Sequence, residues 1–544
     1  MSLNIGIVTL NAKFIHTSLS LRYLRNAARN AGFQNTWIDE YEIDKPVWKI
    51  AADIQSKKPD VIGISIYIWN RILSFQLVET LKKQNPNLIV VVGGPEVSFE
   101  TSLTDNYFVV GGEGEDKWIE CLNIIERGET PTVEILNRWK TYGSDLPKLF
   151  PAYIPEDRIS ILNRISYIET SRGCPYLCSF CLSALDKKVR YFDDSLIEKQ
   201  IEFLVSVGIK TIKFIDRTFN IKPKRVLELM SWLKNFKGTS FHFEVVGDIL
   251  TEETLDFLET VPEGMFQFEI GIQTTDERVQ ETVERKQRND KLFGNIERLV
   301  KSGKVHLHCD LIFGLPGESL KMILGSFNQV FRLQSHELQL GFLKFLPGAP
   351  IRDLIESHEY KYQSFPPYET ISSKDLSADE IIFLKKFADV FELFYNSKRF
   401  RFSIAQLLEM FVPSELFKRL LSFMEERNLV NRNHSLDNQY KIFSDTFSLE
   451  RDSTSLDLLR LDYVYSQRVF RFPEFLRRVD GSDKKYKAWK GDKKSPLFPF
   501  SHTIDLKAGC VALQPSEETL YYAFLHPEEK NGYITEPVLV REIT

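Results

Sequence analysis

The sequence has few of the features that mark membrane, secreted or nucleic-acid-binding proteins. Its longest apolar stretch, Val61–Trp69, is far shorter than the roughly 20 residues that cross a bilayer, and no basic-then-apolar leader follows Met1. Six cysteines in 544 residues are too few for a disulfide framework. With 70 basic and 75 acidic residues, the formal charge of −5 offers no general attraction for nucleic acid. We therefore expect a cytoplasmic protein without membrane association, and a small-molecule substrate rather than nucleic acid.

Residues 1–130 alternate short β-branched runs with helical patterns. This alternation predicts an open, doubly wound α/β domain with a parallel sheet, whose ligands bind beyond the carboxyl ends of the strands. The loops expected there include Gly93–Glu96 and Gly111–Glu115, where paired glycines let the backbone approach a bulky ligand. The expected strands are Leu3–Leu10, Thr36–Tyr41, Asp60–Tyr67, Leu88–Gly93 and Tyr107–Val110.

A second alternating region follows a linker at residues 131–163. Six strands with intervening helices in residues 164–375 predict a partial (β/α)6 barrel, in which loops at the carboxyl ends of the strands carry the chemistry. Residues 376–544 are expected to form a helix-rich extension that begins with the amphipathic segment Ser377–Asn396, and Asp480–Ser495 is the expected disordered loop. The expected barrel strands are Arg164–Thr170, Ile209–Asp216, Ser240–Val246, Phe266–Gln273, Val305–Phe313 and Glu337–Leu346.

The most informative motif is a loop with three cysteines, Cys174, Cys178 and Cys181, that follows the first barrel strand. A structural zinc site needs four ligands and a conventional [4Fe-4S] cluster takes four cysteines, but the other cysteines of the chain are scattered singly. The C-x3-C-x2-C spacing therefore predicts a cluster with one iron open to another ligand. The alternative is a cysteine-rich core turn or an adventitious zinc site.

The loop resembles the signature of the radical S-adenosylmethionine (SAM) superfamily, in which the methionyl amine and carboxylate of SAM bind the open iron. Residues 164–348 also resemble the core of oxygen-independent coproporphyrinogen oxidases, with matching polar residues on successive strands. The residue types suit the ligand, because carboxylates accept from ribose hydroxyls or an ammonium group and a guanidinium clamps a carboxylate. The resemblance implies these SAM-binding residues: Phe180, Asp216, Glu244, Gln273, Arg285 and Asp310.

The N-terminal domain resembles the cobalamin-binding domains fused before such barrels. The Asp-x-His-x-x-Gly motif that supplies a histidine to cobalt is absent, and the first loop offers His16 alone. The resemblance therefore implies base-off cobalamin without a histidine ligand, and we expect His16 at a helix entry or domain interface. The residues implied for cobalamin binding are Asn11, Ser65, Gly93, Gly94, Gly112 and Glu113.

Together the resemblances imply a cobalamin-dependent radical SAM enzyme. Its [4Fe-4S] cluster would cleave SAM reductively to a 5′-deoxyadenosyl radical, with methylation of an unactivated carbon as the expected outcome and flavodoxin or ferredoxin as the electron donor. Alternatives are a radical rearrangement or oxidation, a tRNA methylthiotransferase-like enzyme, and a non-catalytic cobalamin or redox sensor. The methylthiotransferase alternative requires a second cysteine cluster, but the N-terminal domain has only Cys121.

The extension resembles an uncharacterised region that accompanies this pairing of domains in bacterial proteins. Its segment Tyr463–Arg478 interleaves aromatic residues with arginines. This pattern occurs on single-stranded nucleic-acid-binding surfaces, but we expect a helix with buried aromatic rings and solvated arginines. A third alternative is that this segment closes over the mouth of the barrel.

Overall fold

The computed structural model describes residues 3–99, 106–139, 150–468, 471–477, 497–507, 510–525 and 538–541. The chain forms two compact units, Met1–Ala378 and Asp379–Thr544. No helix in the described part of the chain is both long and apolar enough to cross a membrane.

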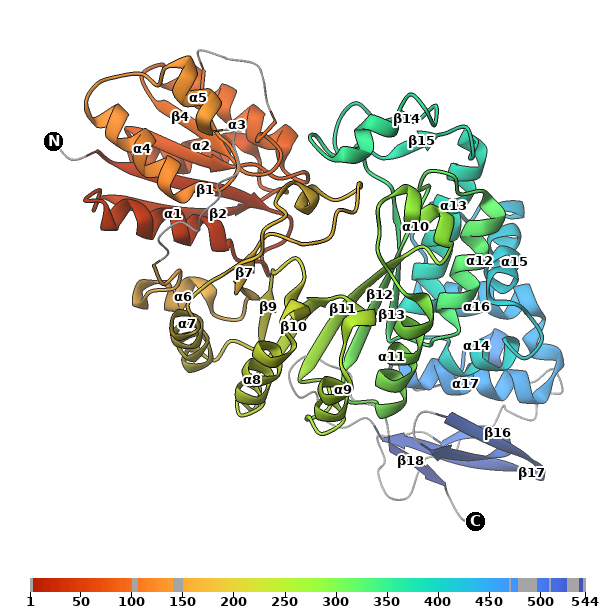
Figure 1. The fold of residues 1–544 in the computed structure, drawn as a ribbon. Coiled ribbons are helices and arrows are strands. Elements are labelled where there is room, and N and C mark those ends of the chain that lie inside the picture. Colours follow the sequence, from red (N-terminus) through yellow and green to blue (C-terminus); the bar gives the residue numbers. More distant parts are fainter. Residues whose placement is uncertain are drawn as a thin grey trace. The chain divides into compact units, whose positions relative to one another are not determined.

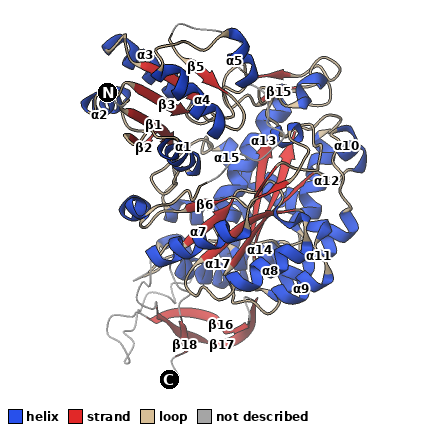
Figure 2. Cartoon of the chain, turned by 60° about the vertical axis from the view of Figure 1, so that its left-hand side comes forward, coloured by secondary structure: helices blue, strands red, loops and turns tan. Residues whose placement is uncertain are grey.

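A five-stranded parallel sheet in the order β2-β1-β3-β4-β5 begins the first unit, with helices on both of its faces (Figure 1, Figure 2). Every residue of β1 is buried, as expected for a parallel strand covered on both sides. The predicted doubly wound domain is confirmed. Its elements are β1 Ile5–Asn11, α1 Leu19–Asn30, β2 Thr36–Glu42, α2 Val47–Ser56, β3 Val61–Ser65, α3 Arg71–Gln84, β4 Ile89–Gly93, β5 Phe108–Val110, α4 Glu115–Glu126 and α5 Val133–Trp139.

A six-stranded parallel sheet in the order β13-β12-β11-β10-β9-β6 follows. Its two edges, β6 and β13, are not paired with each other, so the sheet is the predicted partial barrel. Aromatic side chains of its strands pack against one another, and the ring centroids of Phe214 and Phe243 are 4.6 Å apart. The strands are β6 Ser166–Ile168, β9 Thr211–Phe214, β10 Ser240–Val245, β11 Phe266–Gln273, β12 His306–Phe313 and β13 Glu337–Phe342.

The remaining elements of the first unit cover the barrel or connect its strands (Figure 1). The helices are α6 Arg158–Ile161, α7 Asp194–Val207, α8 Pro223–Leu233, α9 Glu252–Leu258, α10 Glu277–Thr282, α11 Asn289–Ser302 and α12 Leu320–Phe331. Two short antiparallel ribbons are β7 Ser171–Arg172 with β8 Arg190–Tyr191, and β14 Lys361–Tyr362 with β15 Thr370–Ser372.

Buried ion pairs join the two sheets of the first unit. Arg25 in α1 makes two 2.8 Å bonds to Asp157, and both side chains are at most 3% exposed. Arg164, just before β6, pairs with Glu40 of β2 at 2.8 Å. His16 forms a β-bridge with the residue after Arg164 and lies 2.6 Å from the hydroxyl of Tyr167. His16 therefore lies at the domain interface, as expected.

The second unit is rich in helices and also contains an antiparallel sheet, β16-β17-β18, that the sequence analysis did not predict. Asp457 and His502 tie the helices to this sheet through a 2.8 Å contact, and both are buried. The helices are α13 Ala378–Phe391, which begins in the first unit, α14 Arg401–Leu407, α15 Pro413–Glu426, α16 Leu436–Phe447 and α17 Ser453–Ser466. The strands are β16 Leu497–Lys507, β17 Cys510–Leu525 and β18 Val538–Arg541.

Two predictions concern the end of α17 and the residues after it. Tyr463 is buried in α17 and packs edge-on against Tyr440 at 4.9 Å, and Phe472 is buried too, as expected. The helix expected over Tyr463–Arg478 is wrong beyond Ser466, where α17 ends, and the only helical element among the described residues that follow, up to 477, is the 3-10 turn Glu474–Leu476. The loop Asp480–Ser495, expected to be disordered, lies outside the described residues.

Candidate active site

Two adjoining cavities, of about 390 and 460 Å³, lie where strand-end loops of the N-terminal sheet meet the first barrel strands. Both contain loops that follow parallel strands, which is where open α/β sheets bind ligands. The cavities share six lining residues: Ser20, Tyr67, Glu115, Glu169, Arg172 and Ile215. Of the residues predicted to bind cobalamin, Ser65, Gly93, Gly94, Gly112 and Glu113 line the first cavity and Asn11 lines the second.

Gly93 ends β4 and Gly94 follows it, and both lie in the wall of the 390 Å³ cavity. Gly94 has a φ of +106°, and a Cβ on it would lie 2.5 Å from the carbonyl oxygen of Ile66. A Cβ on Gly93 would lie 3.0 Å from the carbonyl oxygen of Val110. Neighbouring backbone thus leaves little room for a side chain at either position, and the two residues line the cavity with backbone alone, which lets a bulky ligand such as a corrin come close.

A stacked aromatic pair forms part of the wall of the 460 Å³ cavity. The rings of Tyr67 and Trp69 lie 4.6 Å apart and nearly parallel. Trp69 is 48% exposed, and both residues line the larger cavity. Neither residue was predicted to bind a ligand, although their loop follows β3 and was therefore a place to expect ligand contacts.

The three cysteines lie in the connection between β7 and the 3-10 turn Leu182–Leu185. All three are free, and Cys174 and Cys178 are buried. Backbone bonds shape the loop, because the amide of Cys181 donates to Cys178 at 3.0 Å and the amide of Cys174 donates to Asp186 at 2.8 Å. Three free thiols on one ordered loop fit the donor set of an iron–sulfur cluster.

One cation of the barrel lies beside this loop. Nη1 of Arg285 is 3.7 Å from Sγ of Cys178. Burial raises the pKa of the Cys178 thiol, and the Arg285 guanidinium opposes that rise. Arg285 also donates to the carbonyl of Gly271 in β11 and to Gln287. The barrel thus holds a guanidinium against the cysteine loop.

Three residues predicted to bind SAM lie on the inner side of the sheet. Burial raises the pKa of Glu244 to about 7 and that of Asp310 to about 8. Gln273 ends β11 with a φ of +67°, at an irregularity in the pairing of β11 with β12. Within the described residues, Oε1 of Gln273 is buried without a hydrogen-bond partner. Oδ1 of Asp310 also accepts no hydrogen bond, although Nε2 of His308 lies 3.3 Å from it. A buried acceptor without a partner fits a polar ligand.

The other two residues predicted to bind SAM have protein contacts. Asp216 is 1% exposed and accepts hydrogen bonds from the backbone and hydroxyl of Thr170 and from the hydroxyl of Ser171, at 2.6–2.9 Å. It therefore anchors the segment that leads into the cysteine loop, and its contact with SAM stays a prediction. Phe180 packs against an apolar cluster that includes Val279 and Leu315.

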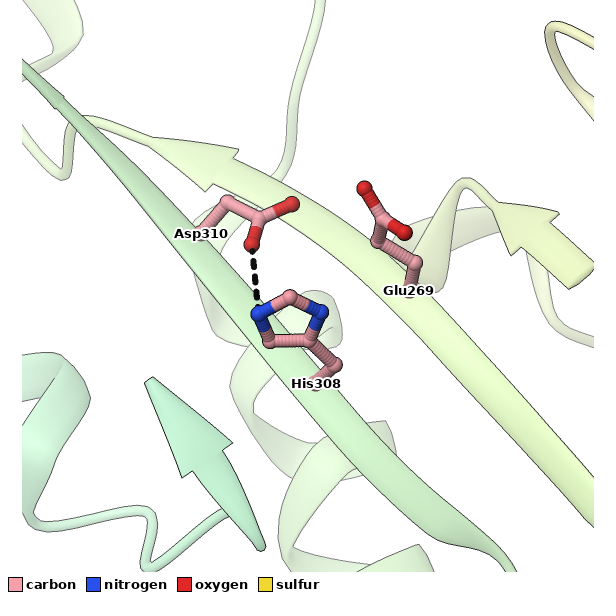
Figure 3. A group of neighbouring side chains, drawn as sticks. All are labelled: Glu269, His308 and Asp310. Atoms are coloured by element: carbon pink, nitrogen blue, oxygen red, sulfur yellow. Dashed lines mark ion pairs between the residues drawn. The ribbon is translucent and has the colours of Figure 1, made fainter. Parts of the chain in front are cut away.

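Asp310 also belongs to a polar cluster whose other members, Glu269 and His308, were not predicted from the sequence. Glu269, His308 and Asp310 offer ligand atoms within 4.8 Å of one another (Figure 3). His308 lies 3.3 Å from Asp310, and burial lowers the pKa of His308, so this histidine is mainly neutral. His242 bonds to Glu269 at 3.1 Å. The signal was available, because polar residues alternate with buried ones along β11 and β12.

Three family models match this chain. Residues 5–121 match the B12 binding domain, residues 168–330 match the radical SAM superfamily, and residues 356–501 match a protein family of unknown function, DUF4080.

Curated relatives have similar sequences. The chain is 24% identical over 368 residues to the cobalamin-dependent radical SAM methyltransferase TokK of Streptomyces tokunonensis, which is 60% of this chain and 53% of that protein. It is also 24% identical over 354 residues to the 2-(S-pantetheinyl)-carbapenam-3-carboxylate methyltransferase of Streptantibioticus cattleyicolor, which is 57% of this chain and 51% of that protein. The matches therefore span about half the length of these relatives.

A solved structure shows the same fold. The cobalamin-dependent SAM radical enzyme OxsB, with aqua-cobalamin and SAM bound, superposes with a TM-score of 0.58 at 13% identity over 85% of this chain and 79% of OxsB. The chain therefore carries, in order along the sequence, one region that matches the B12 binding domain, one that matches the radical SAM superfamily and one that matches DUF4080.

Proposed function

We propose that this chain is a cobalamin-dependent radical SAM enzyme that methylates an unactivated carbon of a small molecule. The observation that carries the proposal is the shared cavity wall. Gly94 and Gly112 of the N-terminal domain and Gly173 and Ser183 beside the cysteines line the same 390 Å³ cavity. In such enzymes the cluster supplies an electron for reductive cleavage of SAM and cobalamin carries the methyl group, while the protein binds, orients and excludes water.

Each part of the site has a role in binding. Cys174, Cys178 and Cys181 hold the cluster through three thiolates and leave one iron to SAM. Glu244 and Asp310 would accept hydrogen bonds from ribose hydroxyls or the SAM ammonium group. Arg285, 3.7 Å from the sulfur of Cys178, would stabilise its thiolate and bind the SAM carboxylate. Gln273 adds an amide with an orphaned oxygen. Phe180 and Asp216 are the further SAM contacts that we propose.

We propose that cobalamin binds base-off and without a histidine ligand, in contact with Asn11, Ser65, Gly93, Gly94, Gly112 and Glu113. The contacts of His16 support this, because its Nδ1 lies 2.6 Å from the Tyr167 hydroxyl and its backbone pairs with Ile165. Electron paramagnetic resonance (EPR) of the cobalt(II) form should show no nitrogen splitting from an axial ligand. Nitrogen splitting that disappears in His16→Ala would contradict this binding mode.

The proposal is tested with protein grown with hydroxocobalamin and purified without oxygen. Wild type should retain corrin absorption and iron, and should form 5′-deoxyadenosine from SAM when a strong reductant is added. Ser65→Trp fills the cavity from a buried wall position and should abolish corrin retention, whereas Ser56→Trp at an exposed position of α2 should not. A corrin-free wild type with an active cluster would contradict the methylase, and an intact cluster without SAM cleavage would favour the sensor.

The partners follow from the same chemistry. A low-potential donor such as flavodoxin or ferredoxin would supply the electron, and a reducing compartment such as the cytoplasm suits a chain whose described cysteines are all free. Transfer of an isotopically labelled methyl group from SAM to a product would distinguish methylation from rearrangement or oxidation.

A further inference from the structure

Two arginines on the ribbon that brackets the cysteine loop reach across to the N-terminal domain. In the antiparallel ribbon β7–β8, Arg172 lies directly opposite Arg190. The cysteine loop is part of the connection between these two strands. Like charges directly opposite each other on neighbouring strands destabilise the pairing. Carboxylates next to each arginine offset this repulsion, and Arg190 also pairs with Asp186 in the connection between the two strands.

Each arginine pairs with a carboxylate of the loop and first turn that open α4. Nη2 of Arg172 is 2.6 Å from Oε1 of Glu115, and Nη2 of Arg190 is 2.6 Å from Oε1 of Glu113. Each arginine contributes a second nitrogen to the same carboxylate, at 3.2 Å and 3.0 Å respectively. Such paired charge-assisted bonds fix the angle as well as the distance between two groups. We call these four residues the Arg–Glu bridge.

The bridge is largely withdrawn from water. The Arg190 side chain is 4% exposed and that of Glu115 is 8% exposed. Arg172 also bonds to Glu169, after the end of β6, at 2.6 Å. An ion pair in such surroundings is costly to break, because the charge left behind lacks both its partner and full hydration. The bridge therefore restrains geometry more strongly than a surface pair would.

The bridge is also part of the wall of the proposed cofactor site. Glu113, Glu115 and Arg172 line the 390 Å³ cavity together with Gly112, and Arg172 is two residues before Cys174. The bridge thus connects the loop proposed to hold cobalamin with the loop proposed to hold the cluster. Nη1 of Arg172 also lies 3.7 Å from Oε2 of Glu113, so the two halves of the bridge are themselves linked.

We propose that Arg172 and Arg190 are positioning residues that fix the separation between the cobalamin loop, residues 111–115, and the cysteine loop, residues 173–181. This inference rests on the proposed function, because it assigns a cofactor to each loop. The arginines act through Glu113 and Glu115. Without the bridge, an unpaired carboxylate would turn towards water and its loop would move with it. The distance between the two loops should then vary over a range instead of having a single value.

The test measures the distance between the reduced cluster and cobalt(II) cobalamin by pulsed EPR in the full-length, reconstituted protein. Arg172→Met and Arg190→Met should broaden the distance distribution or shift it to longer values while iron and cobalt contents stay unchanged. Arg298→Met is the matched control, because Arg298 pairs with Glu252 on α9 at 2.8 Å, away from both loops. An unchanged distribution in both bridge variants would overturn the proposal.

A charge swap separates positioning from general stability. Arg172→Glu alone should disturb the distribution, and adding Glu115→Arg should restore it towards that of wild type; no restoration would count against the bridge. If wild type lacks one of the two EPR signals, the proposed function fails instead. In that case, amide hydrogen exchange of the cofactor-free protein tests the bridge. Faster exchange at residues 112–116 in Arg172→Met than in wild type would support the bridge, and equal exchange would refute it.

Discussion

The guanidinium of Arg285 lies 3.7 Å from the thiol of Cys178, although 107 residues separate them in the sequence. The contact joins the segment after β11 to the cysteine loop after β6, so two distant strand ends of the barrel meet at one point. A cation at this position favours the thiolate form that binds metal, because a nearby positive charge lowers the pKa of a thiol.

Replacing Cys178 with alanine should abolish iron binding and SAM cleavage, because two thiolates in the loop cannot hold the cluster. Iron content and 5′-deoxyadenosine formation measure the result. Cys121→Ala is the matched control, since Cys121 is a buried thiol of α4 in the N-terminal domain. A Cys178→Ala protein with wild-type iron content would show that the loop is not the cluster site.

Replacing Arg285 with methionine should weaken SAM binding roughly tenfold or more, because hydrogen bonds to a charged group contribute about 1.5–3 kcal/mol. Titration calorimetry of the cluster-loaded protein measures this loss. Arg288→Met, at a side chain that is 62% exposed and pairs with Asp248, should leave the affinity unchanged. Equal affinities in the two variants would remove Arg285 from the SAM site.

Asp310 should make the SAM-free protein less stable as the pH rises. Burial raises its pKa in the folded state from 3.8 to about 8, so the folded protein favours the protonated form. The stabilising contribution is complete below the unfolded-state pKa and is lost as the pH rises through about 8. Asp310→Asn should therefore gain thermal stability over wild type progressively between pH 4 and 8. If the melting temperatures of wild type and Asp310→Asn change in parallel across this pH range, the prediction is contradicted.

Replacing Arg25 with methionine should destabilise the first unit by about 3 kcal/mol, because buried Asp157 loses both of its short bonds to a cation and keeps only Arg22, 3.7 Å away. Thermal or denaturant unfolding measures the loss. Lys83→Met is the control, since Lys83 pairs with Glu79 on the exposed surface of α3 and such pairs contribute about 0–1 kcal/mol. A loss no larger than that of the control would show that the Arg25 pair does not hold the domains together.

The sequence by itself determined the strands and the cluster motif. Residues that are buried on both faces of a parallel sheet form continuous apolar runs, so β1 and β4 could be recognised without any knowledge of their neighbours. The three cysteines lie within eight residues, so their spacing already constrains the ligand set. The antiparallel sheet of the second unit was not predicted, because its strands are stabilised by partners distant in the chain.

Only the tertiary structure decided how the site is assembled. Glu113 was expected to bind cobalamin, and its carboxylate is found in an ion pair with Arg190, 77 residues away. Asp216 was expected near SAM, and its oxygens hold Thr170 and Ser171. Residue type fixes whether a side chain can donate, accept or carry charge. Which groups it meets depends on how two separate sheets pack, and no local pattern records that packing.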